Sequence, residues 1–528
     1  MPKVLIADKM SEKAEKIFLE KGLDVDVITG LDKEKLISIV EKYDGIVVRS
    51  STKITEKIFK KAENLKIVGR AGIGVDNIDV DAATANGVVV MNTPFGNAIT
   101  TAEHAIALIL GLMRNLPQAN NSTHKGKWEK SKYMGQEVTG KILGIIGCGN
   151  IGSIVADRAK GLRMRVIAYD PFLTPERANI LGVKKVELND LLQQSDVISL
   201  HVPMTEQTKN IINKKTIGKC KKGVRIINCA RGGLIDEKAL LEAIEKGHIG
   251  GAAIDVYEVE PAKKSILFGN DKIICTPHLG ASTIEAQENV AIQIAEQISD
   301  YLIEGAVTNA LNMPSISADE APMLSPFVKL SEQLGLFAGQ LMLSNFDKIE
   351  IEYVGDISDF NCAPITSAAV SGILKPSLSD INMVNAPSLA RDKGITISEV
   401  KKDESSAYES YIKVSLKTKG RSFSIGGTVF SDGHPRIVQI NGINLEAELN
   451  RNMLYVTNKD VPGLIGHLGL ILGEEGINIA SFNLGRSAPL EDAMALIGVD
   501  SEINAKVIEN VKKLESIVTV NNLIFNIK

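Results

Sequence analysis

Short apolar runs rich in β-branched residues recur from residue 3 to residue 278, and amphipathic stretches separate them. This alternation predicts parallel sheets with helices on both faces, because each parallel connection has to cross over the sheet. Strands of a first sheet are expected at 3–8, 24–28, 45–50, 65–70 and 87–93. A long helix is expected next, at about 97–113. The predicted fold class is therefore α/β.

A second set of apolar runs predicts six strands, the number that a dinucleotide-binding Rossmann sheet requires. These strands are expected at 141–147, 165–170, 196–202, 224–230, 251–257 and 272–278. The chain then enters another helix, which we expect to rejoin the first sheet. The Rossmann unit is therefore predicted to be inserted into a flavodoxin-like first unit.

The chain changes character at 311–326, where small residues and prolines predict a linker. A mixed α+β segment follows it. The last block then reads strand, helix, strand, strand, helix, strand, which is the order of a ferredoxin-like domain. The expected domains are 1–97 with 282–316 for the first unit, 98–281 for the Rossmann unit, 317–449 for an intervening unit and 450–528 for the last unit.

Composition excludes several classes of partner. The net charge of −4 gives no general attraction to nucleic acid or to an anionic membrane. No apolar run reaches the roughly 18 residues that a membrane span needs, and the N-terminus shows no signal peptide. The five cysteines form no Cys-x-x-Cys pair, which argues against a disulfide framework and a zinc site. We therefore expect a cytoplasmic protein with reduced thiols and no metal.

A glycine-rich turn, GCGNIG at 147–152, lies between a predicted strand and a predicted helix. Gly147, Gly149 and Gly152 allow a tight turn and a close approach of the backbone to a pyrophosphate at the helix N-terminus. Asp170 ends the next strand, eighteen residues after Gly152. Its carboxylate would accept hydrogen bonds from the adenosine ribose and repel a 2′-phosphate. The sequence therefore predicts NAD rather than NADP.

Three polar side chains follow predicted strands of the same sheet: Arg231, Glu260 and His278. Oxidation of a hydroxy acid needs a carboxylate anchor, a base for the hydroxyl proton and a group that tunes the base. The planar guanidinium of Arg231 suits the first task, and the imidazole of His278 suits the second. Glu260 suits the third. Taken singly, each residue also fits a structural role at a strand end or turn, but together they predict a catalytic site.

Two arginines end strands of the first sheet and precede small residues. Arg49 is followed by Ser50 and Ser51, and Arg70 by Ala71 and Gly72. Backbone amides of such loops together with a guanidinium form a plausible anion site. Surface arginines at loop starts are the alternative. We expect Arg49, Ser50, Arg70 and Gly72 to bind an anionic part of the substrate.

The runs CARGGLIDEKAL, GGAAIDVYEVEP and TPHLGASTIEAQ closely resemble the signatures of the D-isomer-specific 2-hydroxyacid dehydrogenases around their catalytic Arg, Glu and His. The runs VVRSSTKIT, VGRAGIGVDNID and MNTPFGN extend the likeness, which covers essentially all 528 residues. The C-terminal extension resembles the long members of the family, with an intervening domain and a regulatory ACT domain.

The resemblance implies an NAD-dependent enzyme that oxidises 3-phospho-D-glycerate to 3-phosphooxypyruvate in L-serine biosynthesis. It makes His278 the proton acceptor, Glu260 its partner and Arg231 the carboxylate anchor, and it has Asp255 contact the nicotinamide carboxamide. Further cofactor contacts implied are Ile73, Asn150, Ile151, Val202, Cys229, Ala230, Gly280 and Ala281, with Arg231 and His278 facing both cofactor and substrate.

The last domain resembles one whose paired copies bind L-serine as a feedback effector, with Asp460 and Asn478 at matching positions. Asn458 stands where relatives carry a larger polar side chain, so the effector stays open, and so does a purely dimerising role. The resemblance also implies a homo-oligomer, with a homotetramer favoured. His104 and His201 lie outside the catalytic signature, and we expect them to be structural.

Two other functions remain compatible with the sequence. The first is a dehydrogenase of another D-2-hydroxy acid, such as glycerate or 2-hydroxyglutarate. The second is a non-catalytic, NAD-sensing regulator on the same fold. The regulatory domain and the absence of a basic tail favour the enzyme.

Overall fold

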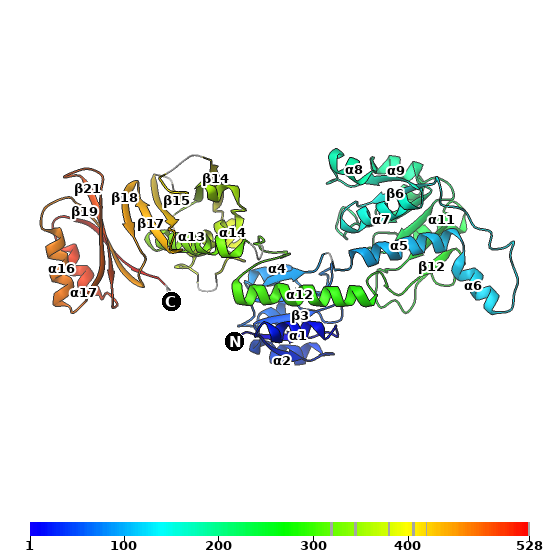
Figure 1. Cartoon of the computed structure of the whole chain (residues 1–528), viewed down its shortest axis with the longest axis horizontal. Coiled ribbons are helices and arrows are strands. Elements are labelled where there is room, and N and C mark those ends of the chain that lie inside the picture. The colour runs from blue at the N-terminus through cyan, green and yellow to red at the C-terminus, as the bar shows by residue number, and fades with distance from the viewer. Residues whose placement is uncertain are drawn as a thin grey trace.

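The computed structural model describes residues 1–94, 96–316, 320–342, 346–378, 381–403, 407–418 and 420–525. The molecule is elongated and contains four sheets, with the first sheet lying between the second and the third (Figure 1). The expected starting residues of the intervening domain, 317–319, and the final residues of the last domain, 526–528, lie outside the described residues. Among the described residues, no helix is long and apolar enough to cross a membrane.

The first sheet is fully parallel, with the strand order β2-β1-β3-β4-β5. Its strands are β1 (Lys3–Ile6), β2 (Asp24–Val27), β3 (Gly45–Val48), β4 (Ile67–Arg70) and β5 (Val89–Asn92). Its helices are α1 (Lys13–Glu20), α2 (Lys33–Ile39), α3 (Glu56–Phe59), α4 (Val80–Ala85) and α12 (Ile284–Glu304). Two apolar clusters, one with α1 and α12 and one with α2 to α4, cover the two faces. Burial on both faces explains why these strands read as continuous apolar runs.

The second sheet is also parallel, with the order β12-β11-β10-β9-β6-β7-β8. Its strands are β6 (Ile142–Ile146), β7 (Arg165–Tyr169), β8 (Lys184–Lys185), β9 (Val197–Leu200), β10 (Arg225–Asn228), β11 (Gly251–Ile254) and β12 (Ile273–Cys275). Its helices are α5 (Ala98–Met113), α6 (Leu116–His124), α7 (Asn150–Gly161), α8 (Pro175–Leu181), α9 (Leu188–Gln194), α10 (Lys214–Ile217) and α11 (Glu237–Glu245). The order reverses beside β6, which is where open α/β sheets bind their ligands.

The expectation of six strands in this sheet is wrong, because the structure has seven. The additional strand, β8, consists of two exposed lysines that pair with β7 at the sheet edge. Such a short and charged edge strand carries no apolar pattern, so its sequence could not indicate it.

The chain passes twice between the first two sheets. It leaves the first sheet after β5 and enters the second through α5, which packs on α7, β10 and β11. It returns after β12 through α12, which packs on α1, β4 and β5. Figure 1 shows α12 running along the first sheet and α5 along the second.

The third sheet is mostly antiparallel and has the order β14-β13-β15-β16-β17-β18. Its elements are α13 (Ala321–Met342), β13 (Lys348–Gly355), α14 (Ala363–Leu374), α15 (Ala386–Asp392), β14 (Thr396–Lys402), β15 (Ser410–Thr418), β16 (Arg421–Val429), β17 (Pro435–Ile440) and β18 (Ile443–Ala447). The linker expected at 311–326 is shorter than predicted, because residues 321–326 already belong to α13. Pro322 lies in the first turn, where amide hydrogens have no helical partner, so this proline is compatible with a helix start.

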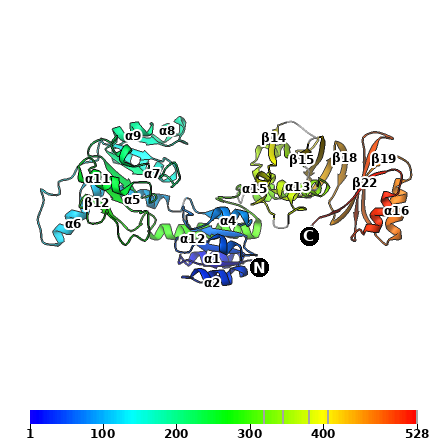
Figure 2. The same ribbon diagram turned by 180° about the vertical axis from the view of Figure 1, so that it is seen from behind.

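The fourth sheet has the order β20-β21-β19-β22. Its elements are β19 (Asn452–Lys459), α16 (Leu464–Glu474), β20 (Ile479–Arg486), β21 (Asp492–Val499), α17 (Ala505–Lys512) and β22 (Ile517–Ile524). Both helices pack on one face of the sheet. The opposite face, with Tyr455 and Leu496, joins the apolar cluster of the third sheet and α13. Figure 2 shows the two sheets side by side from behind, with α16 on the outer surface.

Candidate active site

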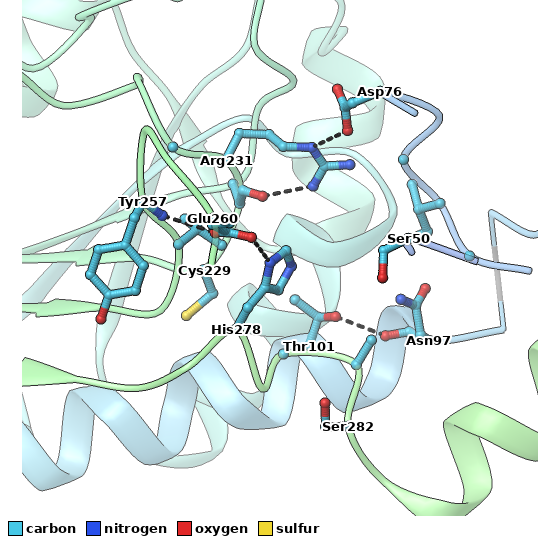
Figure 3. Close-up of a pocket in the computed structure, with 18 of the residues that line it drawn as sticks. Ser50, Asp76, Asn97, Thr101, Cys229, Arg231, Tyr257, Glu260, His278 and Ser282 are labelled. Carbon is cyan, nitrogen blue, oxygen red and sulfur yellow. Dashed lines mark hydrogen bonds and ion pairs between the residues drawn. The ribbon is translucent and has the colours of Figure 1, made fainter. Parts of the chain in front are cut away.

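A cavity of about 1280 Å³ lies between the first two sheets and is lined by residues of both. Most of the predicted site residues line it: Arg49, Ser50, Arg70, Gly72, Ile73, Asn150, Ile151, Val202, Cys229, Ala230, Arg231, Glu260, His278, Gly280 and Ala281. Figure 3 shows Arg231, Glu260 and His278 on one side and Ser50 and Asp76 on the other. The volume exceeds that of an ordinary small-ligand pocket, roughly 300–1,000 Å³, as a dinucleotide together with a substrate would require.

His278 and Glu260 form a direct pair. His278 Nδ1 lies 2.6 Å from Glu260 Oε2, and Glu260 Oε1 accepts a hydrogen bond of 2.9 Å from the backbone N of Tyr257. The hydrogen bond to Glu260 raises the pKa of His278, although burial opposes this. Burial would raise the pKa of Glu260, but hydrogen bonds from His278 and Tyr257 outweigh burial and lower it. The pair can therefore hold a proton on the imidazole beside a charged carboxylate.

Arg231 already has an anionic neighbour, which comes from the first sheet. Its Nε lies 3.1 Å from Oδ2 of Asp76, and its Nη1 donates a 2.7 Å hydrogen bond to the carbonyl of Ala230. Asn228 fixes this turn by bonding both Ala230 N and the Arg231 carbonyl. The Asp76 side chain is 74% exposed, so this ion pair is weak and another anion can replace Asp76.

Arg49 and Arg70 lie together on the side of the first sheet. Arg70 Nε donates to Asn77 Oδ1 and its Nη1 to the Ala71 carbonyl, both at 3.0 Å. Burial, and then the charges of Arg49 and Arg231, lower the pKa of Arg70 to about 10. Three guanidinium groups that repel one another across one cavity are stabilised when a multiply charged anion binds between them.

The glycine turn has the shape that a pyrophosphate needs. Gly147 has a φ of +92°, and a Cβ on Gly152 would overlap the carbonyl of Gly147. Helix α7 begins at Asn150, so its free amide hydrogens point towards the turn. Asp170 accepts hydrogen bonds of 2.8 Å from Cys148 N and from Phe172 N, which fix its carboxylate beside the turn. These residues fit the dinucleotide expected from the sequence.

Asp255 lies behind the cavity wall rather than on it. Its side chain is fully buried, and it accepts hydrogen bonds from Thr276 Oγ1 at 2.6 Å, Leu279 N at 2.7 Å and Gly280 N at 2.9 Å. The expected contact with the nicotinamide carboxamide therefore remains a prediction. In the structure, this carboxylate holds the loop that carries His278.

Several residues of the site were not predicted from the sequence. Asp76 and Asn77 contact Arg231 and Arg70, and Asn97 and Thr101 line the cavity from α5 and the turn before it. Asp76 and Asn77 lie in the run GIGVDNID, which carries part of the family resemblance. The resemblance gave no role to these two side chains. His104, expected to be structural, lies 3.4 Å from Asp255.

His104, Cys229 and Asp255 bring possible metal-ligand atoms within 4.8 Å of one another. However, the Asp255 oxygens already accept three hydrogen bonds from the loop. Burial also raises the pKa of the Cys229 thiol, and a neutral thiol is a poor metal ligand. The donor set therefore fits a hydrogen-bonded cluster better than a metal site.

The two predicted effector residues lie far from the cavity, in the fourth unit. Asp460 accepts hydrogen bonds of 3.2 Å from Arg486 Nη1 and Leu490 N, and Asn478 donates to Asp500. Asn458 is buried on β19, and its side-chain oxygen has no hydrogen-bond partner within the described part of the chain.

Two family models match the chain. Residues 106–280 match the D-isomer specific 2-hydroxyacid dehydrogenase NAD binding domain, and residues 323–441 match the D-3-phosphoglycerate dehydrogenase intervening domain. Among solved structures, D-lactate dehydrogenase from Aquifex aeolicus complexed with NAD and lactic acid is similar, with a TM-score of 0.53, 29% identity, and coverage of 59% of this chain and 100% of that one.

Similar proteins also match over almost the whole length. The D-3-phosphoglycerate dehydrogenase of Bacillus subtilis is 42% identical over 98% of this chain and 99% of its own. That of Methanocaldococcus jannaschii is 41% identical over 99% of this chain and 100% of its own. The chain therefore belongs to the D-isomer specific 2-hydroxyacid dehydrogenases, within the D-3-phosphoglycerate dehydrogenase branch, and is an NAD-dependent oxidoreductase.

Proposed function

We propose that this enzyme oxidises 3-phospho-D-glycerate at C2 to 3-phosphooxypyruvate, the first step of the phosphorylated route to L-serine. The observation that carries the proposal is that the His278–Glu260 pair and three arginines line one cavity. The similarity to D-3-phosphoglycerate dehydrogenases over nearly the whole chain supports the same substrate.

The arginines and the histidine of the cavity have distinct roles in this reaction. Arg231 exchanges Asp76 for the C1 carboxylate of the substrate, because both are carboxylates within reach of one guanidinium fork. Arg49 and Arg70, with the backbone around Ser50 and Gly72, hold the phosphate. His278 accepts the proton of the C2 hydroxyl.

Glu260 stabilises the imidazolium that His278 then becomes. When bound, NAD supplies the acceptor for the C2 hydride. Residues 147–152 and Asp170 would hold the dinucleotide, with Ile73, Val202, Cys229, Ala230, Gly280 and Ala281 beside it.

The test is NADH formation by the purified full chain with 3-phospho-D-glycerate, compared with D-glycerate and D-2-hydroxyglutarate. We expect the phosphorylated acid to have the highest kcat/KM. Replacing Arg70 by alanine should raise KM for 3-phospho-D-glycerate and leave KM for D-glycerate nearly unchanged. Equal losses on both acids would favour another D-2-hydroxy acid. Tight NAD binding without turnover of any acid would favour an NAD-sensing regulator.

We further propose that the fourth unit is an ACT domain that binds L-serine as a feedback inhibitor through Asp460 and Asn478. The strand–helix–strand–strand–helix–strand order with both helices on one face supports this assignment. L-serine should inhibit the wild-type enzyme and inhibit the Asp460→Ala variant less. Inhibition that is unchanged by the substitution would place the effector elsewhere.

Homo-oligomerisation, with a tetramer favoured, is also proposed. Large apolar side chains around the second sheet are strongly exposed in the single chain: Trp128 at 87%, Met134 at 79% and Phe172 at 93%. Exposed aromatic and methionine side chains are enriched in protein–protein interfaces. Light scattering of the purified protein measures the assembly directly, and a mass of 56.9 kDa would contradict it.

A further inference from the structure

The loop that carries His278 is held by hydrogen bonds from inside the domain of the second sheet, which we call the second domain. On either side of the histidine, the loop donates to the Asp255 carboxylate through Thr276, Leu279 and Gly280. The backbone N of His278 also donates to the Asp255 carbonyl, at 2.9 Å. His278 itself has a φ of +56°, a left-handed conformation that a non-glycine residue keeps only when its surroundings enforce it. Asp255 supplies that enforcement.

The buried Asp255 carboxylate has an ionisable partner on its other side. Nε2 of His104 lies 3.4 Å from Asp255 Oδ1, and the Asp255 side chain has no exposed surface. Burial alone would raise the pKa of Asp255, but interactions led by His104, and then by Thr276 and Leu279 N, outweigh burial and lower it. A buried carboxylate without such a partner is costly, so His104 helps to keep Asp255 charged in place.

His104 belongs to the helix that connects the two domains. Helix α5 follows directly on the crossover from β5, and it packs on β10 and β11. One turn before His104, Thr101 lies against the loop, because a Cβ added at Gly280 would be 3.4 Å from Thr101 Cγ2. Thr100 Oγ1 also lies 3.3 Å from Thr283 Oγ1, at the second crossover. Contacts from His104 to Asp255 and from Asp255 to the loop therefore link the crossover helix to His278.

We propose that His104 is a positioning residue for the oxidation. It is not among the residues that line the cavity, and it acts by holding the Asp255 carboxylate, which fixes the His278 loop for proton transfer. The inference rests on the proposed function, because it takes His278 as the proton acceptor.

The experiment compares His104→Leu, which removes the polar contact to the Asp255 carboxylate, with His104→Gln, whose amide nitrogen can replace Nε2. The matched control is His248→Leu, because the His248 ring also bonds within the second domain, to the Ile217 carbonyl at 2.9 Å, but lies outside the cavity lining. For each full-length variant, kcat with 3-phospho-D-glycerate, the Kd for NADH and the thermal unfolding midpoint are measured. Wild-type turnover is established first, so failure of the proposed function is seen before any variant is compared.

We expect kcat of His104→Leu to fall about 10-fold or more, the effect of removing one polar partner of a buried charged group. The Kd for NADH should change less than about threefold. His104→Gln should recover most of kcat, and His248→Leu should lower the unfolding midpoint with kcat retained. A kcat of His104→Leu within twofold of wild type, a glutamine variant no better than leucine, or a loss explained by weaker NADH binding would each overturn the proposal.

Discussion

The His278–Glu260 hydrogen bond of 2.6 Å makes the two side chains one titrating unit. Oxidation needs the neutral imidazole, since an imidazolium cannot accept the hydroxyl proton. The pKa of His278 is raised, so the oxidation rate should fall on the acid side of a value above the ordinary 6.5 or so. The reverse reaction needs the protonated imidazole and should be favoured at pH values below this raised pKa.

Replacing Glu260 by glutamine removes the charge that raises the pKa of His278. The acid limb of the kcat/KM profile for oxidation should therefore move to lower pH. The maximal rate should fall by at least about 10-fold, because the imidazolium loses its stabilising carboxylate. The pH dependence of NADH formation measures both effects. Glu245→Gln, on the exposed surface of α11, is the control that should change neither. An unmoved acid limb would show that Glu260 does not tune His278.

In the proposed function, Asp76 competes with the substrate carboxylate for Arg231. An ion pair with a partner as exposed as Asp76 contributes about 0–1 kcal/mol, so the substrate can displace it readily. Asp76→Asn should lower KM for 3-phospho-D-glycerate by up to about fivefold, with kcat nearly unchanged. Steady-state kinetics measure this, and Asp81→Asn, on the exposed side of α4, is the control. A higher KM would mean instead that Asp76 orients Arg231 for the substrate.

The sequence predicted these residues unequally. Arg231 and His278 could be placed together because the carboxyl ends of parallel strands meet at one sheet edge. Asp76 could not, because its approach to Arg231 depends on the angle between two domains, which no local pattern encodes. His104 looked structural because a lone histidine on a largely apolar helix gives no sign of which buried group it faces.

Among the elements, β-branched runs correctly predicted the parallel strands of the first two sheets. The sequence did not predict strand β8 or the start of α13. It also gave no indication that α13 and α14 cross at close range. Glycines mediate it: a Cβ at Gly335 would overlap the Ala369 carbonyl, and one at Gly339 would overlap the Ile373 carbonyl. In the sequence, these glycines look only like weak points in a helix.

Gly339→Ala should lower the thermal unfolding midpoint, although alanine is the better helix former by about 1 kcal/mol. The added methyl group has to push the α14 backbone away, and this outweighs the gain in helix propensity. Gly469→Ala on α16 is the matched control, because a Cβ there meets nothing within 4 Å. This control should be neutral or stabilising. A stabilised Gly339→Ala protein would contradict the close crossing.

In the whole molecule, the third and fourth sheets share one apolar core. The ring centroid of Phe337 on α13 lies 5.5 Å from that of Tyr455 on β19 and 6.2 Å from that of Phe525. Gln340 of α13 also bonds both the N and the carbonyl of Ile524 on β22. The sequence separated these units at a boundary near 449–450, because apolar patterning shows which residues are buried but not which unit covers them.

Phe337→Ala should therefore destabilise both sheets together, by about 3–5 kcal/mol for a fully buried aromatic ring. Hydrogen exchange should show lower protection in β15 and β16 and in β19 to β22 at the same time. Phe18→Ala, in the core of the first sheet, is the control and should leave exchange in these strands unchanged. Loss of protection in the third sheet alone would show that the two units unfold independently.

The two crossovers between the first and second sheets also restrict how the cavity can close. The two covalent connections lie close together, as the Thr100–Thr283 contact shows, and form a hinge between the two sheets. Rotation about that hinge strains neither connection, whereas sliding the sheets past each other stretches at least one. We therefore expect closure of the cavity to be a rotation about this hinge, which brings the arginines of the first sheet to a defined place opposite His278.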